Sequence, residues 1–191
     1  SRLGYYLPGI RDDAFFRPSV NIIYKLKRDN AAPVNLRMNY SQTIAVPSLR
    51  ELTLIRIFDY TLMGVVTGNP NLKPVNIDNY DLRFEAYFKS GNNITASLFY
   101  KNFTNHIEML REDKDQVYYT WQNATNSNCK GIELEGRLGI VKNLELRANT
   151  SIIKSQTQLQ GASKTRTMFG QAPFVINTML SYTSEKMGLT A

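Results

Sequence analysis

The feature that most constrains the fold is an alternation of apolar and polar residues with a period of two. From Pro18 to Leu26 an apolar side chain occupies every second position. Similar runs cover residues 34–41, 80–89, 94–101, 132–138, 144–149 and 174–182, and residues 188–191 begin another. Successive side chains of a strand point to opposite faces, so each run predicts a strand with one apolar and one polar face. The chain is therefore predicted to be all-β, with about eight strands that pair antiparallel as hairpins.

The connections between these strands alternate between short and long. The short ones are Arg28 to Pro33, Ser90 to Asn93, Gly139 to Asn143 and Ser184 to Met187, and the long ones are Pro47 to Ile77, Asn105 to Gln116 and Gln156 to Gln171. In a single antiparallel sheet, all short turns are expected on one edge and all long loops on the other. This arrangement is typical of an outer-membrane barrel, which has short periplasmic turns and long outer loops.

Aromatic residues on the apolar face form pairs in which the partners stand at positions i and i+8. The pairs are Phe16 with Tyr24, Tyr80 with Phe88, and Phe174 with Tyr182. In a tilted strand this spacing covers roughly 20 Å of membrane normal, close to the ~25 Å apolar band between aromatic girdles. The pairs favour a transmembrane β-barrel over a soluble carbohydrate-binding β-sandwich, which the alternation alone would also fit. A membrane-spanning helix is excluded, because no run of 18 consecutive apolar residues occurs.

The barrel interpretation predicts which side chains meet lipid and which line a wet interior. Apolar residues should point outward, and charged or polar residues of the same strands should point inward. The outward set is Leu36, Met38, Leu82, Phe84, Leu98, Leu134, Leu146, Ile176 and Leu180. The inward set is Arg37, Arg83, Glu85, Glu133, Arg147 and Asn177. One segment, Thr120 to Cys129, does not alternate cleanly, which indicates either a bulge or a strand that extends above the membrane.

Charge and reactive residues argue against nucleic-acid binding and catalysis. The 191 residues carry a net charge of +7, but basic and acidic residues alternate along the strands, so no basic patch emerges. The single histidine, His106, has no nucleophile motif beside it, and the single cysteine, Cys129, has no partner for a disulfide or a zinc site. We therefore predict no enzyme activity, no catalytic residue, no metal site and no cofactor.

Several segments resemble the barrel of TonB-dependent outer-membrane receptors. Gly68 to Pro74 (GNPNLKP), followed by Asn79 to Glu85 (NYDLRFE), is similar to a signature of that family, as is Arg50-Glu51-Leu52. Residues 99–102, 123–124, 130–135 and 170–174 also resemble later strands of these barrels. The resemblance implies a barrel of about 22 strands in the outer membrane of a Gram-negative bacterium. Residues 1–191 would then be one partial barrel domain that lacks the plug domain, the first strands and the last strands.

The resemblance also implies a function and partners. The expected function is energy-dependent uptake of a bulky extracellular ligand such as a siderophore, an oligosaccharide or a peptide. The expected partners are outer-membrane lipid, that ligand, and the TonB energy-coupling protein, reached through an N-terminal region missing from this chain. The alternative is a complete eight-stranded outer-membrane barrel with a structural or adhesive role.

Ligand contacts in such barrels come from outer loops and the upper lumen, which gives a set of candidate residues. Arg50, Asp59 and Tyr60 lie in the loop from Ser48 to Lys73, and Tyr118, Tyr119 and Trp121 are expected near the rim. Stacking aromatics beside polar groups would suit a sugar, a peptide or a siderophore. Alternatively, these aromatics belong to the outer aromatic girdle.

Overall fold

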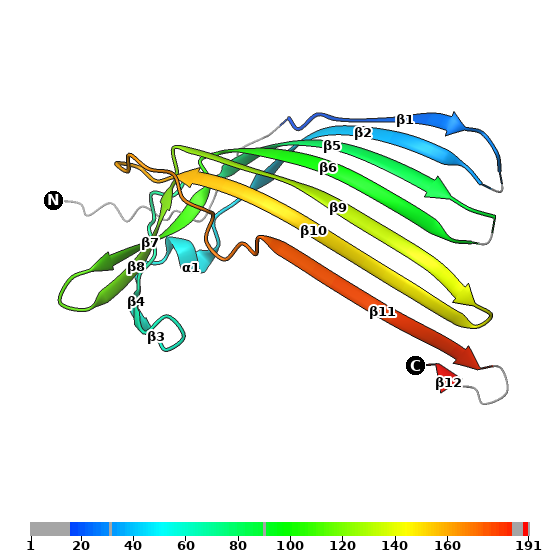
Figure 1. The fold of residues 1–191 in the computed structure, drawn as a ribbon. Helices are drawn as coiled ribbons and strands as arrows, with labels where there is room; N and C mark the ends of the chain where they lie inside the picture. Colours follow the sequence, from blue (N-terminus) through cyan, green and yellow to red (C-terminus); the bar gives the residue numbers. More distant parts are fainter. Residues whose placement is uncertain (1–15, 31, 90, 185–188, 191) are drawn as a thin grey trace.

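A computed structural model describes residues 16–30, 32–89, 91–184 and 189–190 (Figure 1). The elements are β1 (Ser19–Lys27), β2 (Val34–Ala45), α1 (Leu49–Leu52), β3 (Ile57–Asp59), β4 (Gly64–Val66), β5 (Val75–Tyr87), β6 (Asn93–Thr104), β7 (Ile107–Asp113), β8 (Val117–Asn123), β9 (Asn126–Val141), β10 (Leu144–Gln158), β11 (Phe174–Ser184) and β12 (Leu189–Thr190). None of the helices in the described part of the chain is long and apolar enough to span a membrane.

The main sheet has eight strands in the order β1-β2-β5-β6-β9-β10-β11-β12, and every neighbouring pair is antiparallel. The strands lie side by side as one long curved sheet (Figure 1). The connections β1–β2, β5–β6 and β9–β10 leave at the end drawn on the right, where β11 also ends, so the prediction of one edge for the short turns is confirmed for these three. The described residues do not include Ala31, Ser90 and residues 185–188 of the short turns, or Ala191 of the last predicted strand.

The register of the sheet confirms that each predicted set of side chains shares one face. Directly opposite residues of antiparallel neighbours point to the same side. Met38 lies opposite Leu82, Leu82 opposite Leu98, and Leu146 opposite both Leu138 and Leu180. On the other face, Arg37 lies opposite Arg83. Period-two alternation and hairpin pairing together place the apolar and the charged residues on opposite sides.

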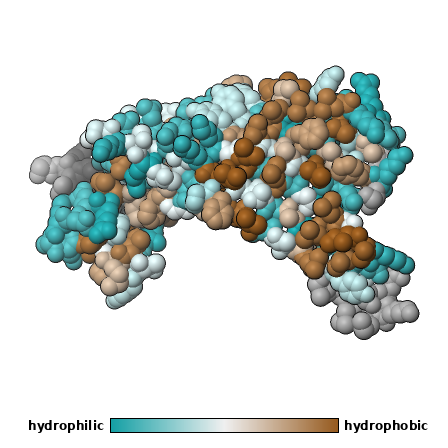
Figure 2. Space-filling model, in the orientation of Figure 1, coloured by the Kyte–Doolittle hydropathy of each residue, from teal (hydrophilic) through white to brown (hydrophobic). Residues whose placement is uncertain are grey.

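The apolar face is not covered by a second layer. Its side chains remain largely exposed, as shown by the exposed fractions of 50% for Leu98, 49% for Leu134 and 65% for Ile176. Figure 2 shows hydrophobic residues gathered over this part of the molecule. In a soluble sandwich these residues would be buried against a facing sheet, so the sandwich alternative is wrong for the described residues. Such a large uncovered apolar surface requires another apolar phase or partner.

The polar face carries a ladder of ion pairs that crosses several strands. The Arg37 guanidinium donates to Glu85 at 2.9 Å, and Arg83 bonds both Glu85 at 3.1 Å and Glu135 at 3.3 Å. Nearer the short turns, Glu145 pairs with Arg137 at 2.7 Å and also with Arg147. Glu85 and Glu145 each have two arginine partners, so their charges remain balanced when one partner is lost.

A second sheet, which the alternation pattern did not predict, lies at the end of the long connections. It has four strands in the order β3-β4-β8-β7, and it is drawn at the lower left of Figure 1. The predicted loop from Pro47 to Ile77 contains α1, β3, β4 and the start of β5, and the predicted loop from Asn105 to Gln116 contains β7. We call this sheet together with α1 the loop-end subdomain. Strands β3 and β4 have only 3 residues each, too short for alternation to reveal them.

The ambiguous segment from Thr120 to Cys129 contains the end of β8 and the start of β9, and the part from Asn126 is a strand extension and not a bulge. From Asn126 onward, β9 pairs with β10 without a register shift until the short turn, where the shift lies between Leu144 and Glu145. Ser127 lies opposite both Phe103 and Thr157, and the buried hydroxyls of Ser127 and Thr157 are 2.6 Å apart. The regular ladder therefore continues past the apolar part of the strand toward the loop end.

Candidate ligand-binding site

The structure brings the two groups of candidate residues, which are distant in the sequence, into the loop-end subdomain. Strand β4 pairs in parallel with β8, with Val65 opposite Tyr118 and Val66 opposite Tyr119. Arg50 belongs to α1, Asp59 ends β3, and Tyr60 follows it. The short helix begins with a capping box, in which Ser48 and Glu51 satisfy each other's backbone N–H groups. The loop from Ser48 to Lys73 and the β7–β8 hairpin thus form one unit.

Tyr119 and Trp121 form the core of this unit. Their exposed fractions are 9% and 8%, and they pack with Val66 and Leu72. The Tyr119 hydroxyl donates to the carbonyl oxygen of Leu62 at 3.2 Å. Buried positions of this kind supply apolar packing energy to a small subdomain. Core packing accounts for both residues, and neither side chain faces lipid as a girdle residue would.

The remaining candidate residues lie on the surface of the loop-end subdomain. The Arg50 guanidinium donates to Asp59 at 2.9 Å, while the other Asp59 oxygen accepts N–H groups of Thr61 and Leu62 at 2.9 and 3.2 Å. The backbone N–H of Leu62 and then the Arg50 guanidinium hold the pKa of Asp59 below its usual value. The charged pair is therefore preorganised beside Tyr60, which is 82% exposed.

Tyr118 lies on the β8 strand of the same sheet. Its hydroxyl accepts a hydrogen bond from Gln116 Nε2 at 2.8 Å, and the Lys114 ammonium lies 6.0 Å from the centre of its ring. An aromatic face beside polar donors can stack on a sugar or an aromatic ligand group.

A groove that sequence analysis missed lies next to the Arg50–Asp59 pair. It has a volume of about 210 Å³ and is lined by Leu49, Arg50, Thr53, Ile55, Ile57, Val66 and Gly68. Leu49, Ile55 and Ile57 are 80%, 64% and 56% exposed. An apolar groove with a few fixed polar groups at its margin is the usual form of a ligand site. The signal in the sequence is a set of closely spaced apolar residues that does not alternate, namely Leu49, Leu52, Leu54, Ile55 and Ile57.

The signature segment from Gly68 to Pro74 holds the loop-end subdomain together. The Gly68 and Asn69 N–H groups donate to the carbonyls of Thr53 and Glu51 at 2.9 and 2.6 Å. The Asn69 side chain donates to the carbonyl of Trp121 at 2.9 Å, and Leu72 is only 1% exposed. The segment thus connects α1 to β8, so its role in this structure is to position the groove.

Replacing Gly68 with alanine is expected to loosen α1 from β8. A Cβ atom at this position would lie 2.4 Å from the Thr53 carbonyl oxygen and 2.7 Å from its nitrogen, both backbone atoms that cannot move independently. Such overpacking costs about 1–3 kcal/mol. Limited proteolysis of the complete protein should show faster cleavage in residues 46–74. Gly136→Ala is the matched control, because its Cβ would meet only one atom at 4.0 Å. Equal cleavage of the two variants would contradict this prediction.

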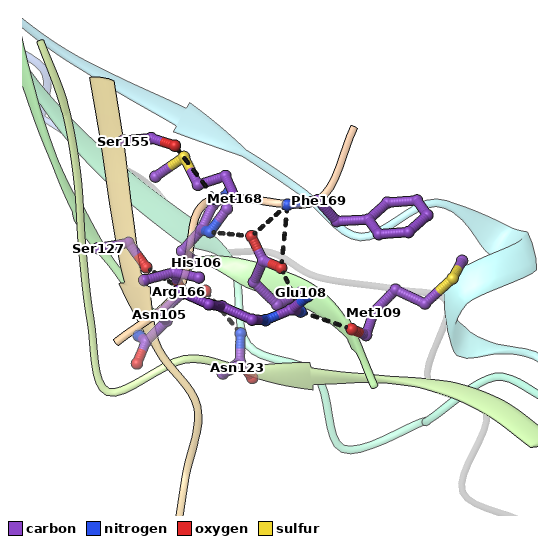
Figure 3. A network of polar contacts seen from close by, with 11 residues as sticks. Asn105, His106, Glu108, Met109, Asn123, Ser127, Ser155, Arg166, Met168 and Phe169 are labelled. Carbon is purple, nitrogen blue, oxygen red and sulfur yellow. Dashed lines mark hydrogen bonds and ion pairs between the residues drawn. The ribbon is translucent and has the colours of Figure 1, made fainter. Parts of the chain in front are cut away.

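A buried polar network joins β7 to the long connection between β10 and β11 (Figure 3). The Glu108 carboxylate, with a side chain 1% exposed, accepts Arg166 Nη2 at 2.7 Å and the N–H of Phe169 at 3.3 Å. Arg166 Nη2 also donates to the carbonyl of Met109 at 2.7 Å, and its backbone forms a bridge with Thr157 of β10. These contacts fasten the β10–β11 connection to both sheets.

Burial shifts the pKa values of two titratable groups of this network, Glu108 and His106. Burial raises the pKa of Glu108, against the opposing effects of Arg166 and of the Phe169 N–H. Burial also lowers the pKa of His106, so the neutral imidazole is favoured. His106 Nδ1 is 3.4 Å from Glu108 but makes no hydrogen bond. Within the described residues no group of three or more His, Cys, Asp or Glu side chains could hold a metal ion.

Comparison with solved structures shows that the sheet is similar to part of larger receptors. The siderophore receptor PirA of Pseudomonas aeruginosa matches 89% of this chain over 31% of its own, with 15% identity and a TM-score of 0.64. A mutant of the ferric enterobactin receptor PfeA of Pseudomonas aeruginosa matches 88% of this chain over 25% of its own, with 18% identity and a TM-score of 0.57. The chain therefore spans less than a third of the length of these receptors.

Comparison with protein families matches nearly the whole chain. The family model described as "TonB dependent receptor-like, beta-barrel" matches residues 4–189. No curated protein sequence matches. Members of this family are transporters of the outer membrane of Gram-negative bacteria, not enzymes. The open antiparallel sheet, its uncovered apolar face and this match together show that the chain belongs to the TonB-dependent receptor β-barrel family.

Proposed function

We propose that the chain is a partial barrel domain of an outer-membrane receptor that takes up a bulky extracellular ligand with energy supplied through TonB. The observation that carries the proposal is the uncovered apolar face, opposite a face that carries ion pairs. Lipid would cover the first face, and the second would line a wet interior. The other strands of a barrel of about 22 strands would pair with the outer edges of β1 and β12. TonB would bind an N-terminal region outside this chain. The proposed function needs no cofactor.

The ligand class that we propose is a siderophore, an oligosaccharide or a peptide, bound at the loop-end subdomain. The apolar groove beside Arg50 and Asp59, together with Tyr60 and Tyr118, offers apolar, ionic and stacking contacts to one ligand. The names of PirA and PfeA favour testing a ferric siderophore first. A complete eight-stranded barrel is less well supported, because β1 and β12 do not pair with each other in the described residues.

Truncation of Arg50 and Tyr60 tests the proposed site. In the complete protein, the double variant Arg50→Ala/Tyr60→Ala should lower the affinity for a ferric siderophore about 30- to 1,000-fold, since interface arginine and tyrosine residues often contribute about 1–2 kcal/mol each. Binding of ferric enterobactin to intact cells is the measurement, with an oligosaccharide mixture as the second probe. Arg111→Ala is the control, because Arg111 is an exposed arginine of the same subdomain that pairs with Asp113.

Deletion of the energy-coupling segment from the complete protein separates an active receptor from a passive channel. Uptake should stop in that deletion while binding to the cell surface persists. Uptake that continues at the original rate would point to a passive porin. Unchanged ligand affinity in the double variant would instead remove Arg50 and Tyr60 from the site and leave the receptor function intact.

A further inference from the structure

The register orders the apolar face into rows whose chemistry changes along the strands toward the loop end. One row consists of Ile22, Met38, Leu82, Leu98, Ile132, Ile152 and Phe174. The next row toward the loop end consists of Val20, Tyr40, Tyr80, Tyr100, Lys130 and Lys154. The row beyond that consists of Gln42, Asp78, Asn102, Asn128 and Gln156. Apolar, amphipathic and fully polar residues thus follow one another on the same face.

This order places the middle row at the boundary between hydrocarbon and head groups. Tyrosine concentrates at that boundary because its ring is apolar and its hydroxyl is polar. The rings of Tyr40 and Tyr80 lie 5.1 Å apart, and those of Tyr80 and Tyr100 lie 6.1 Å apart, so they form a continuous band. Because the strands of a barrel are tilted, neighbouring residues of one row differ in membrane depth by about 3 Å per strand. The long lysine side chains at the end of the row can span this difference and reach the head-group layer.

The lysine end of this row holds two like charges side by side. Lys130 of β9 lies directly opposite Lys154 of β10, and both side chains are exposed. Like charges directly opposite each other on a sheet are destabilising. No salt bridge among the described residues includes Lys130 or Lys154. Apart from each other, their cross-strand and diagonal neighbours on this face are uncharged. An anion from outside the protein would remove this repulsion.

We propose that Lys130 and Lys154 bind the phosphate group of an outer-leaflet lipid. The pair offers two ammonium groups to one phosphate, with Tyr100 beside them as a further hydroxyl donor. Ile132 and Ile152, directly below on the same strands, offer an apolar surface to the acyl chains of the same molecule. Because the charged pair lies directly beside this apolar surface, a lipid, which has both a phosphate group and acyl chains, fits the site better than a free phosphate ion. The inference rests on the proposed outer-membrane location, because it requires lipid on the apolar face.

The test measures lipid binding by the complete protein, purified in a neutral detergent. Lipid A, a glycolipid with two phosphate groups, should bind and raise the melting temperature, whereas phosphatidylcholine and inorganic phosphate should not. In Lys130→Ala/Lys154→Ala the affinity for lipid A should fall about tenfold or more, since each basic residue near a membrane surface contributes appreciably to the attraction of anionic lipid. Lys130→Arg/Lys154→Arg should restore binding, because both charges are kept.

The matched control is Lys101→Ala, which removes a lysine from the neighbouring strand β6 on the polar face of the sheet, opposite Cys129. Its lipid A affinity should equal that of the unchanged protein. Equal binding by the double alanine variant and the unchanged protein would overturn the inference, and so would an equal response to inorganic phosphate. Heat-modifiable mobility on gels measures barrel formation independently of lipid binding. If the complete protein forms no barrel in membranes, that result contradicts the proposed function and not only the lipid site.

Discussion

Replacing Leu82 with arginine in the complete protein is expected to lower the yield of assembled barrel. Leu82 lies in the middle of its apolar row, between Met38 and Leu98. An arginine on the lipid face costs about 2–4 kcal/mol at the middle of the membrane and less toward the boundary, which lies one row away at Tyr80. Leu146→Arg, between Leu138 and Leu180, should have a similar effect. The folded fraction is measured by heat-modifiable mobility of outer-membrane extracts.

The matched controls exchange arginine for leucine on the other face of the same strands. Arg83→Leu leaves Glu85 paired with Arg37 at 2.9 Å, and Arg147→Leu leaves Glu145 paired with Arg137 at 2.7 Å. Because no buried carboxylate loses its last partner, assembly should remain close to normal, while transport can change. Should the arginine variants assemble as well as the leucine variants, the apolar face would not be the lipid face.

Replacing Arg166 with methionine is expected to release the connection between β10 and β11 from β7. The change leaves the Glu108 carboxylate, 1% exposed as a side chain, with only the Phe169 N–H as a hydrogen-bond donor. Removing one partner of a buried pair costs about 3–5 kcal/mol, and the lower end applies because Arg166 is 40% exposed. Trypsin cleavage after Lys164, on intact cells that carry the complete protein, should accelerate on the order of 100-fold.

Two further variants show whether the buried charge causes this effect. Glu108→Gln removes the charge itself and leaves Arg166 able to reach water, so cleavage should accelerate less than in Arg166→Met. Asp113→Asn breaks the exposed pair with Arg111, whose side chains are 58% and 67% exposed, and should change cleavage little. If Asp113→Asn accelerates cleavage as much as Arg166→Met, burial of Glu108 is not the cause.

The sequence alone determined the main sheet, because its two signals are local. Period-two alternation depends only on the pleat, so the faces of Leu82 and Arg83 follow from their positions in the strand. Connection lengths fixed the order of hairpins and hence the edge on which the short turns lie. Local signals do not report closure of the sheet. Closure into a barrel of about 22 strands depends on pairing with strands outside this chain, so it stays a prediction.

Only the tertiary structure decided the loop-end subdomain, because its contacts join residues far apart in the chain. The parallel pairing of Val66 with Tyr119 gives no periodic signal, so the burial of Tyr119 and Trp121 could not be distinguished from a rim position. Glu108 likewise looks like any strand carboxylate until the fold brings Arg166, 58 residues later, to 2.7 Å from it. Burial and partner are properties of packing between distant segments, and alternation within a segment does not contain them.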